Sequence, residues 1–422
     1  MGVPLKRPGA RRVMDDHLRE LAELADTAGA VVVGEMTQQI ERPHPGTYLG
    51  KGKLAELGAK VQELQASLVI FDDELSPSQG KNIEDAIGTR VMDRAELILD
   101  IFATRARSAE AKMQVELAQL EYMLPRLTRM WSHLEKFRGG IGVRGPGETQ
   151  LETDRRLINH RIKVLRERLV DVQRGRIVQR QSRQSEFKGS IVGYTNAGKS
   201  SILRVLSGQD VFVEDRLFAT LDPLTRDVDL GDNSHVLLTD TVGFIRKLPH
   251  HLVASFRATL EETRDADLLL HVVDASAPTW EEQRIVVEQV LDELEVNDRP
   301  KLLVFNKIDL LSHDQLLALQ ERIGALVPNS IFVSTRTEGG LEPLKRALLS
   351  ALRVRRPIAH IRMSPADGKM LAEIHRDGEV IEQHMDGDML FVEARVDEAL
   401  AGRLRRSGAE VSNGKAAPML SS

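Results

Sequence analysis

The sequence predicts an α/β fold, because strand-like and helical patterns alternate along two long stretches of the chain. Short apolar runs alternate with amphipathic runs before residue 105, and they do so again between 187 and 355. In the second stretch, the loop from Gly193 to Ser200 stands between a strand-like run and a helical run and carries the G-x-x-x-x-G-K-S spacing. We therefore expect parallel sheets in both stretches and a P-loop domain in the second.

The composition limits the class of protein further. The chain has 422 residues, of which 41% are hydrophobic, enough for about three domains with sizeable cores. It contains no cysteine, which excludes disulfides and thiolate metal sites, and no run approaches the roughly 18 to 20 apolar residues of a membrane helix. The basic amino end is not followed by the apolar core of a signal peptide. We expect a cytoplasmic protein with no integral membrane segment, and peripheral association with a membrane stays open.

Residues 1–105 are expected to form an N-terminal α/β subdomain. Apolar residues recur at helical spacing from Met14 to Ala25 and predict the first helix. The other elements expected here are a buried strand at 30–33, a helix at 53–65, strands at 68–71 and 90–92, and a helix at 76–86. Their alternation predicts a small parallel sheet.

Residues 106–186 are expected to form a basic helical hairpin. Apolar side chains alternate at spacings of four and three from Met113 to Leu134, which is the seam of one long helix, although Pro125 interrupts it. A second seam runs from Leu151 to Val172. The glycine-rich segment 138–147 between them predicts an irregular loop at the tip of a long antiparallel pair. The alternative is that both helices simply pack on the P-loop domain.

Residues 187–355 are expected to form the P-loop domain, and residues 356–422 a small C-terminal α+β unit. Strands are expected at 189–192, 235–239, 268–273, 301–305 and 330–333, with helices at 253–262 and 281–294. In the C-terminal unit we expect a strand at 389–396, then a helix up to Arg406, and a disordered tail after Ser412.

The phosphate loop is expected to hold a nucleotide through Gly193, Tyr194, Thr195, Asn196, Ala197, Gly198, Lys199 and Ser200. Its glycines allow backbone N–H groups to point at an anion, and the helix that follows adds its dipole. Lys199 places a positive charge on the outer phosphates, and the Ser200 hydroxyl is expected to bind Mg²⁺. A glycine-rich turn in an ordinary fold is the alternative for this loop taken alone.

Two further motifs follow in order, each after an apolar run. In Asp240-Thr241-Val242-Gly243, the Asp240 carboxylate is expected to reach Mg²⁺ through water and the Gly243 N–H to meet the γ-phosphate. In Asn306-Lys307-Ile308-Asp309, the Asp309 carboxylate can accept hydrogen bonds from guanine N1–H and the 2-amino group. Adenine offers no such pair of donors, so the three motifs together predict a P-loop GTPase domain that binds GTP and GDP.

Two shorter segments complete the predicted nucleotide site. Phe218-Ala219-Thr220-Leu221-Asp222 lies between the first two motifs. We expect Thr220 to close on Mg²⁺ through its hydroxyl and on the γ-phosphate through its N–H, with Thr225 as the alternative. Ser334-Thr335-Arg336 follows the last strand, where a loop that contacts the base is expected, and it matches such a loop in part.

Phe244 follows Gly243, at the place where many GTPases have a glutamine that orients the attacking water. Phenylalanine cannot do this, so intrinsic hydrolysis is expected to be slow, and Lys199, Thr220 and Gly243 are the predicted catalytic residues. Asn196 suggests one source of help, because GTPases with asparagine at this place in the loop can bind K⁺ beside the phosphates. A role for K⁺ is therefore a hypothesis for this chain.

Positive charge is concentrated in the expected hairpin. Residues 138–183 contain twelve Lys or Arg against five Asp or Glu, whereas the whole chain has a net charge of −5. The basic residues of the second helix that lie off its apolar seam are Arg155, Arg156, Arg161, Lys163, Arg166 and Arg168. Such a helix is typical of surfaces that bind nucleic acid, and a glycine-rich tip can enter structured RNA, which is recognised by shape. A solvated helix face is the alternative.

The chain resembles the HflX family of translational GTPases over nearly its whole length. The GTPase motifs GYTNAGKS, FATLDP and DTVGF match the family pattern, whereas the loop at 334–336 departs from it. Outside those motifs, the resemblance rests on the segment GTYLGKGK at 46–53 and on the segment RGPGETQLETDRR at 144–156.

The resemblance implies a function that the motifs alone do not. HflX-like proteins bind the large ribosomal subunit and its RNA, hydrolyse GTP faster on the ribosome, and split stalled ribosomes under stress such as heat. Their hairpin loop reaches the peptidyl transferase region, a role that would fall here to residues 138–147. The family also binds some ATP. We expect a monomer that uses Mg²⁺; the alternatives are a GTP-switched RNA-binding regulator with incidental turnover and a subunit-assembly factor.

Overall fold

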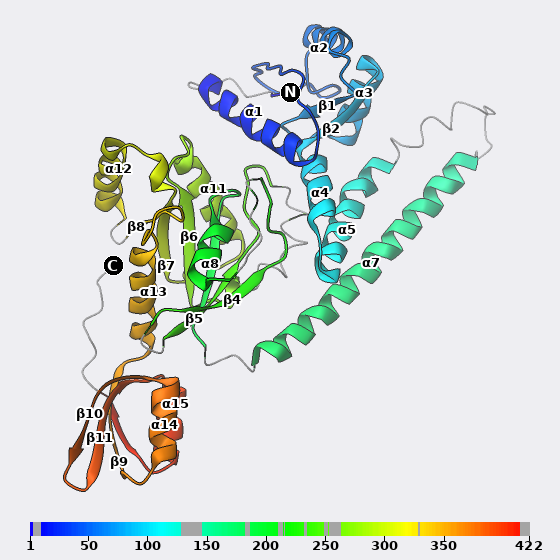
Figure 1. The fold of residues 1–422 in the computed structure, drawn as a ribbon. Helices are drawn as coiled ribbons and strands as arrows, with labels where there is room; N and C mark the ends of the chain where they lie inside the picture. Colours follow the sequence, from blue (N-terminus) through cyan, green and yellow to red (C-terminus); the bar gives the residue numbers. More distant parts are fainter. Residues whose placement is uncertain are drawn as a thin grey trace. The chain divides into compact units, whose positions relative to one another are not determined.

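The structure is a computed structural model that describes residues 1–2, 10–127, 146–181, 186–209, 214, 216–231, 234–248, 252, 263–327 and 330–413. The chain forms two compact units. The first contains residues 1–178 together with 214–222 and 242–260, and the second contains 179–213, 223–241 and 261–422. Figure 1 shows the elements of both units.

An α/β domain forms the amino-terminal part of the first unit (Figure 1). Its elements are the helices α1 (Ala10–Thr27), α2 (Lys51–Glu63) and α3 (Pro77–Ile87) and the parallel strands β1 (Leu68–Phe71) and β2 (Arg90–Asp93). Ser76 starts α3, because its side chain accepts a hydrogen bond from the Gln79 N–H in a capping box. The core around Leu49, Phe71 and Ile83 is fully buried. The predicted parallel pairing of the strands at 68–71 and 90–92 is confirmed.

One predicted strand, at 30–33, is wrong. The structure has no strand there, and the side chains of Val31, Val32 and Val33 are 86%, 46% and 54% exposed. The run of valines is typical of a buried strand, but a strand needs a hydrogen-bonded neighbour. Within the described part of the chain, no strand pairs with residues 30–33.

Helices α4 (Arg94–Arg105) and α5 (Ala109–Met123) also belong to the first unit, as does α7 (Pro146–Gln181) up to residue 178. Leu117 on α5 packs against Ile162 and Leu165 on α7 in a buried seam. Pro125 ends the regular helix in a 3-10 turn, η1 (Leu124–Arg126). Figure 1 shows α7 running back past α5, which confirms the predicted hairpin. The predicted tip loop at 138–147 lies largely outside the described residues.

The second unit contains a six-stranded sheet in the order β4-β5-β3-β6-β7-β8. Its parallel strands are β3 (Lys188–Gly193), β5 (His235–Asp240), β6 (Leu268–Asp274), β7 (Lys301–Asn306) and β8 (Ile331–Phe332), while β4 (Leu224–Asp229) pairs antiparallel with β5. Among the described residues, the α-helices of this domain are α8 (Lys199–Ser207), α11 (Trp280–Glu293), α12 (His313–Leu326) and α13 (Glu342–Arg355).

This sheet confirms the predicted P-loop fold. Because helices cover both faces of a mostly parallel sheet, its central strands are almost wholly apolar, as the buried run 268–273 of β6 is. Strand β4 was not predicted, because alternating charges at Arg226, Asp227 and Asp229 hide its apolar residues. The predicted helix at 253–262 lies outside the described residues.

A small α+β domain completes the second unit. Its elements follow the order β9 (Ile358–Met363), α14 (Gly368–Asp377), β10 (Glu379–Asp386), β11 (Met389–Arg395), α15 (Glu398–Arg406) and β12 (Glu410–Asn413). The strands form an antiparallel sheet in the order β10-β11-β9-β12, with Ile361, Val392 and Leu400 fully buried in its core. The predicted strand and helix of this region are confirmed. None of the described helices is both long and apolar enough to cross a membrane.

Candidate nucleotide-binding site

The phosphate loop has the strand–loop–helix setting that the sequence predicts, because β3 ends at Gly193 and α8 begins at Lys199. Gly198 has a φ of 91°, and a Cβ atom at this position would collide with the side-chain amide of Asn306. A Cβ atom at Gly193 would likewise collide with the carbonyl oxygen of Val272 in β6. Both ends of the loop therefore require glycine.

Lys199 is held inside this loop. Its side chain is buried, and Nζ donates hydrogen bonds to the carbonyl oxygens of Gly193, at 3.3 Å, and Tyr194, at 2.9 Å. Burial lowers the pKa of Lys199 to about 8, although the Asp240 carboxylate favours the charged form. The positive end of the α8 dipole and the ammonium group lie at the same place, which suits an anion such as a nucleotide phosphate.

Ser200 and Asp240 lie together beside the loop. The Ser200 hydroxyl donates a hydrogen bond to Oδ2 of Asp240 at 2.5 Å, and Asp240 is fully buried at the end of β5. A hydroxyl and a carboxylate are hard oxygen ligands of the kind that Mg²⁺ prefers. In the described ranges, no group of three or more His, Cys, Asp or Glu side chains that could hold a metal ion occurs.

The segments predicted to contact guanine come together in the second unit. Nδ2 of Asn306 donates a hydrogen bond to the carbonyl oxygen of Ala197 at 3.0 Å, which ties this segment to the phosphate loop. The Ser334 hydroxyl donates to Oδ1 of Asp309 at 2.6 Å and accepts a hydrogen bond from the Arg336 N–H at 3.1 Å. The buried Ser334 thus orients the carboxylate to which the sequence assigns the choice of base.

Asp274 is a residue of this site that the sequence reasoning missed. It is the last residue of β6, and its Oδ2 lies 2.7 Å from Nζ of Lys307. Its Oδ1 accepts hydrogen bonds from the N–H of Ser276 at 2.9 Å and from its hydroxyl. Lys307 has a φ of 63°, and the ion pair holds this strained residue in place. The signal was an acidic residue directly after a predicted strand, where parallel sheets place their ligands.

The structure places Phe218 and Asp222, two predicted nucleotide-binding residues, in the first unit with their partners there. The Phe218 ring is buried and stands edge-on to Phe102 of α4, with ring centroids 4.7 Å apart. The Asp222 carboxylate accepts hydrogen bonds from the N–H groups of Arg107, at 3.1 Å, and Ser108, at 3.2 Å, and from the Ser108 hydroxyl. These partners are more than 100 residues away in sequence, so no local pattern could have found them. Ala219, Thr220 and Leu221 lie between the two anchored residues.

Val242 and Gly243 also belong to the first unit, and an ion-pair cluster follows them. Lys247 binds Asp72 at 2.7 Å through Nζ, and Arg246 lies 3.5 Å from the same carboxylate. Arg94, which is buried, pairs with Asp72 at 2.7 Å and also with Glu20. Burial raises the pKa of Asp72, but the three cations outweigh it, so that the pKa lies below its ordinary value. Asp72 therefore stays charged and holds the segment after Gly243 on β1.

Three family models match successive parts of the chain. The family model for the N-terminal part of a GTP-binding GTPase matches residues 15–103, the model for the middle region of a GTP-binding GTPase matches 105–183, and the model described as a 50S ribosome-binding GTPase matches 188–307. Fold, site and family models together define the chain as a GTP-hydrolysing enzyme of the P-loop class.

The relatives narrow the class to one family. GTPase HflX of Caldanaerobacter subterraneus subsp. tengcongensis is 46% identical over 397 residues, which cover 93% of this chain and 90% of the relative. GTPase HflX of Escherichia coli is 44% identical over 378 residues, which cover 88% of each chain. A crystal structure of a GTP-binding protein from Sulfolobus solfataricus in complex with GDP is 25% identical, covers 83% of this chain and 98% of that chain, and has a TM-score of 0.43. The chain belongs to the HflX family of GTPases.

Proposed function

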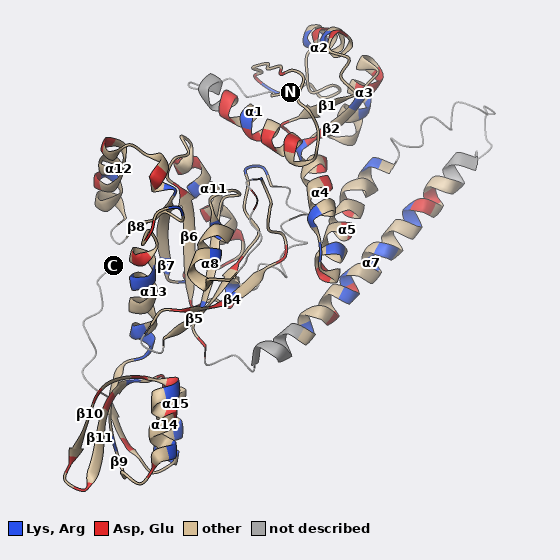
Figure 2. Ribbon diagram, in the orientation of Figure 1, with Lys and Arg blue, Asp and Glu red and all other residues tan. Residues whose placement is uncertain are grey.

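We propose that this GTPase binds the large ribosomal subunit, hydrolyses GTP faster there, and in this way splits or rescues stalled ribosomes under stress. One observation carries the proposal: a GTPase domain whose family model is described as 50S ribosome-binding is joined in one chain to an arginine-rich helix. In Figure 2 the positions of Lys and Arg are blue, and several of them lie along the ribbon of α7. Ribosomal RNA is the partner whose phosphates such a surface suits.

Four parts of the chain share this work in our proposal. They are an N-terminal α/β subdomain at 1–105, the basic hairpin at 106–186, the GTPase domain at 187–355 and the C-terminal domain at 356–422. The hairpin binds rRNA, and GTP hydrolysis in the GTPase domain controls how long the protein stays bound. The protein works as a monomer in the cytoplasm.

The chain's own residues explain how GTP is held for attack by water. Lys199 and the N–H groups of the phosphate loop stabilise the negative charge that spreads over the γ-phosphate oxygens. Ser200 and Asp240 would hold Mg²⁺, which supplies charge neutralisation between the outer phosphates. Thr220 and Gly243 are proposed to close on the γ-phosphate, and Asp309 selects guanine over adenine.

Outside help is needed for fast turnover in this proposal. Phe244 is buried and has no group that can orient water, so the ribosome is proposed to complete the catalytic arrangement. Asn196 supports a second contribution, from K⁺ beside the phosphates; its φ of 59° marks a specialised loop conformation. GTP turnover measured in potassium and in sodium salts at equal ionic strength should be faster in potassium, and equal rates would remove K⁺ from the mechanism.

The experiment that tests the proposal is co-sedimentation with purified large ribosomal subunits in GTP, GDP and a non-hydrolysable GTP analogue. We expect the chain to pellet with the subunits in the analogue and to remain in the supernatant in GDP. Small subunits serve as the matched control and should not carry the chain down. Association that does not depend on the nucleotide, or no association at all, would contradict the proposal. A regulator or assembly factor would bind the subunit without any stimulation of turnover.

A further inference from the structure

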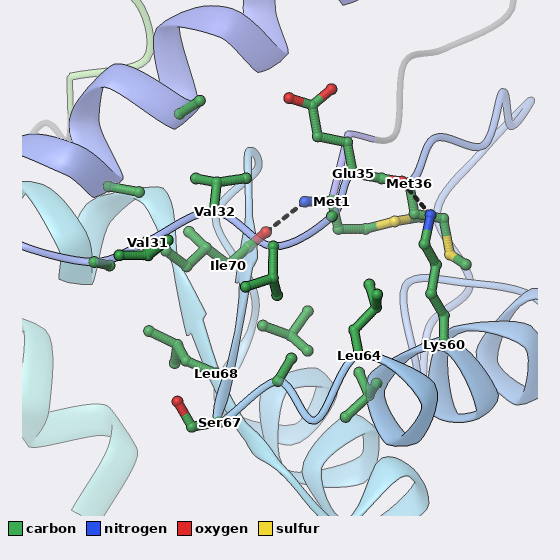
Figure 3. Close-up of a pocket in the computed structure, with 18 of the residues that line it drawn as sticks. Met1, Val31, Val32, Glu35, Met36, Lys60, Leu64, Ser67, Leu68 and Ile70 are labelled. Atoms are coloured by element: carbon green, nitrogen blue, oxygen red, sulfur yellow. Dashed lines mark hydrogen bonds between the residues drawn. The ribbon is translucent and has the colours of Figure 1, made fainter.

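Two exposed features of the described residues have no part in the proposed function. One is a pocket of about 310 Å³ in the N-terminal domain, lined by residues 30–36, by β1 and by parts of α1 and α2 (Figure 3). Its walls are mainly apolar, so their chemistry favours no particular occupant. The other is one face of the sheet in the C-terminal domain, where aromatic rings and charged groups lie side by side.

This sheet has one face that is covered by helices. Its elements follow the order strand–helix–strand–strand–helix–strand, and both helices lie on the same side of the sheet (Figure 1). Ile374 of α14 and Leu400 of α15 pack there against Ile361 of β9. Because successive side chains of a strand alternate between its faces, the residues next to Ile361 and their register partners point to the opposite face. We call this the open face, and its central members are His360, Arg362, Glu382, His384, Phe391 and Glu393.

Three rings lie together on the open face. His384 and Phe391 are directly opposite each other in β10 and β11, with ring centroids 4.8 Å apart and planes inclined by 38°. The His360 ring of β9 lies 5.6 Å from Phe391, measured between centroids. The His384 side chain is 50% exposed, and Phe391 is half-buried between its two neighbours. The rings therefore present an accessible aromatic surface, on which a planar cation or a nucleobase can stack.

Two carboxylates beside the rings lack a cationic partner. Glu382 and Glu393 are directly opposite each other in β10 and β11, and like charges in this arrangement destabilise a sheet. Among the described residues, no Lys or Arg lies within ion-pair distance of either carboxylate, and Glu382 has only His384, at 3.5 Å. Asp386, on the same strand, is paired with Arg362 at 3.3 Å. Negative charge that is not neutralised is thus concentrated next to the rings.

We propose that the open face is a docking surface for an arginine-bearing segment of a basic protein. One guanidinium group would lie flat on the Phe391 ring and direct its N–H groups at the carboxylates of Glu382 and Glu393. Arginine suits this place better than lysine, because its planar fork can stack on a ring and bond to carboxylates at the same time. The bound cation would also remove the repulsion between the two carboxylates.

The charge of the open face favours a protein segment over nucleic acid. Arg362 and Arg395 are the arginines of this face in the described strands, and they are paired with Asp386 and, at 3.9 Å, with Glu379. Single-stranded RNA also stacks on aromatic rings of open sheets, but its phosphates need cations. Here they would meet five carboxylates, those of Glu379, Glu382, Asp386, Glu393 and Glu410.

The surface is built from other elements than the nucleotide site and the basic hairpin. Its strands, β9, β10 and β11, all belong to the C-terminal domain, to which neither GTP binding nor RNA binding is assigned. A test of the open face therefore does not depend on the proposed function, and either can fail without the other.

Peptide binding to the full chain tests the proposal. The fluorescein-labelled peptide Gly-Arg-Gly-Arg-Gly-Arg-Gly is titrated with the chain, and its fluorescence anisotropy is measured. We expect this peptide to bind, and the matched peptide with lysine in place of arginine to bind more weakly. In Glu382→Gln/Glu393→Gln the affinity should fall about tenfold or more, because hydrogen bonds to charged groups are lost. In Phe391→Leu it should fall about threefold, because the cation loses the face of the ring.

A matched double variant separates the site from net charge. Glu282→Gln/Glu293→Gln removes the same charge from exposed residues of α11 and should leave the affinity for the peptide unchanged. Thermal unfolding shows that the variants are folded. Glu382→Gln/Glu393→Gln should unfold at the same temperature as the unchanged chain or at a higher one, because two like charges no longer face each other.

Four outcomes would overturn the proposal. They are no binding of the arginine peptide, equal binding of the arginine and lysine peptides, and equal losses of affinity in the two double variants, which would show that only net charge matters. The fourth uses a labelled oligouridine in place of the peptide. Binding of this RNA that is lost in Phe391→Leu would assign the rings to nucleobases instead of an arginine.

Discussion

Asp309 is the residue to which we assign the choice of guanine, and its carboxylate is held by the Ser334 hydroxyl at 2.6 Å. In Asp309→Asn, the amide replaces one acceptor oxygen with a donor, which opposes the guanine N1–H. We expect the affinity for GTP to fall about a hundredfold, the loss of hydrogen bonds to a charged group, and the affinity for xanthosine triphosphate to rise. Titration with fluorescent analogues of both nucleotides measures the change, and unchanged GTP affinity would remove Asp309 from base recognition.

Lys199 is expected to make the affinity for a nucleotide depend on pH. Its pKa of about 8 in the free protein means that the side chain loses its charge as the pH rises through 8. Phosphates favour the charged form, so binding raises this pKa and takes up a proton. Above pH 8 the affinity for GDP should therefore fall by about tenfold for each pH unit. In Lys199→Ala, GDP should bind more weakly at every pH and without this slope between pH 8 and 9; a slope that survives would belong to another group.

The residues of the site differ in how far the sequence could predict them. Lys199, Ser200 and Asp309 follow from motif spacing, because the phosphate loop and the base loop are local structures. The hydrogen bonds from Arg107 and Ser108 to Asp222 and the pairing of Lys307 with Asp274 depend on which strands and helices become neighbours in space. Such contacts join residues far apart in the chain, so they cannot be predicted from the sequence until the fold is known.

Among the elements, helix α7 carries two kinds of arginine, those that form ion pairs with α5 and those that face solvent. Arg161 and Arg166 pair with Glu116 and Glu121 of α5 at 2.6 and 2.7 Å, and so they help to close the hairpin. Arg155 and Arg156 lie on the same helix and are exposed. The charge run identified in the sequence therefore combines internal ion pairs with side chains that face solvent.

This division makes a prediction about RNA binding. The double variant Arg155→Ala/Arg156→Ala should weaken binding to large subunits and lower the salt dependence of binding by about two charges. The matched control, Arg161→Ala/Arg166→Ala, removes the same charge from residues already neutralised by α5 and should have a smaller effect. Binding isotherms at several salt concentrations measure both. Equal losses in the two variants would show that only the net charge of α7 matters.

Strands were predicted correctly where an apolar run in the sequence also has a hydrogen-bonded partner strand in the structure. Strands β1, β3, β6 and β7 carry clear apolar runs and find neighbours in the described sheets. Residues 30–33 carry an equally clear run but have no neighbour, and the prediction fails there. In the C-terminal domain, β9, α14, β10 and β12 were not predicted. For β10 the reason is that six of its residues are exposed, so it lacks a buried face that a pattern can reveal.

In the whole molecule, each of the two compact units is built from segments that are not contiguous in the sequence. Segments 214–222 and 242–260 lie between parts of the GTPase domain in sequence, yet they group with residues 1–178. In GTPases, segments at these places respond to the γ-phosphate. We therefore expect the nucleotide state to reach the N-terminal domain through Asp222 and through the cluster around Asp72.

The central claim is that this GTPase is completed by the ribosome, and steady-state GTP turnover tests it most directly. Phosphate release is measured for the chain alone, with large ribosomal subunits and with small subunits at equal concentration. Because Phe244 leaves the attacking water without a glutamine, we expect slow turnover of the chain alone and a rise of at least about tenfold with large subunits only. Turnover that is the same with and without large subunits would show that the ribosome does not complete this GTPase.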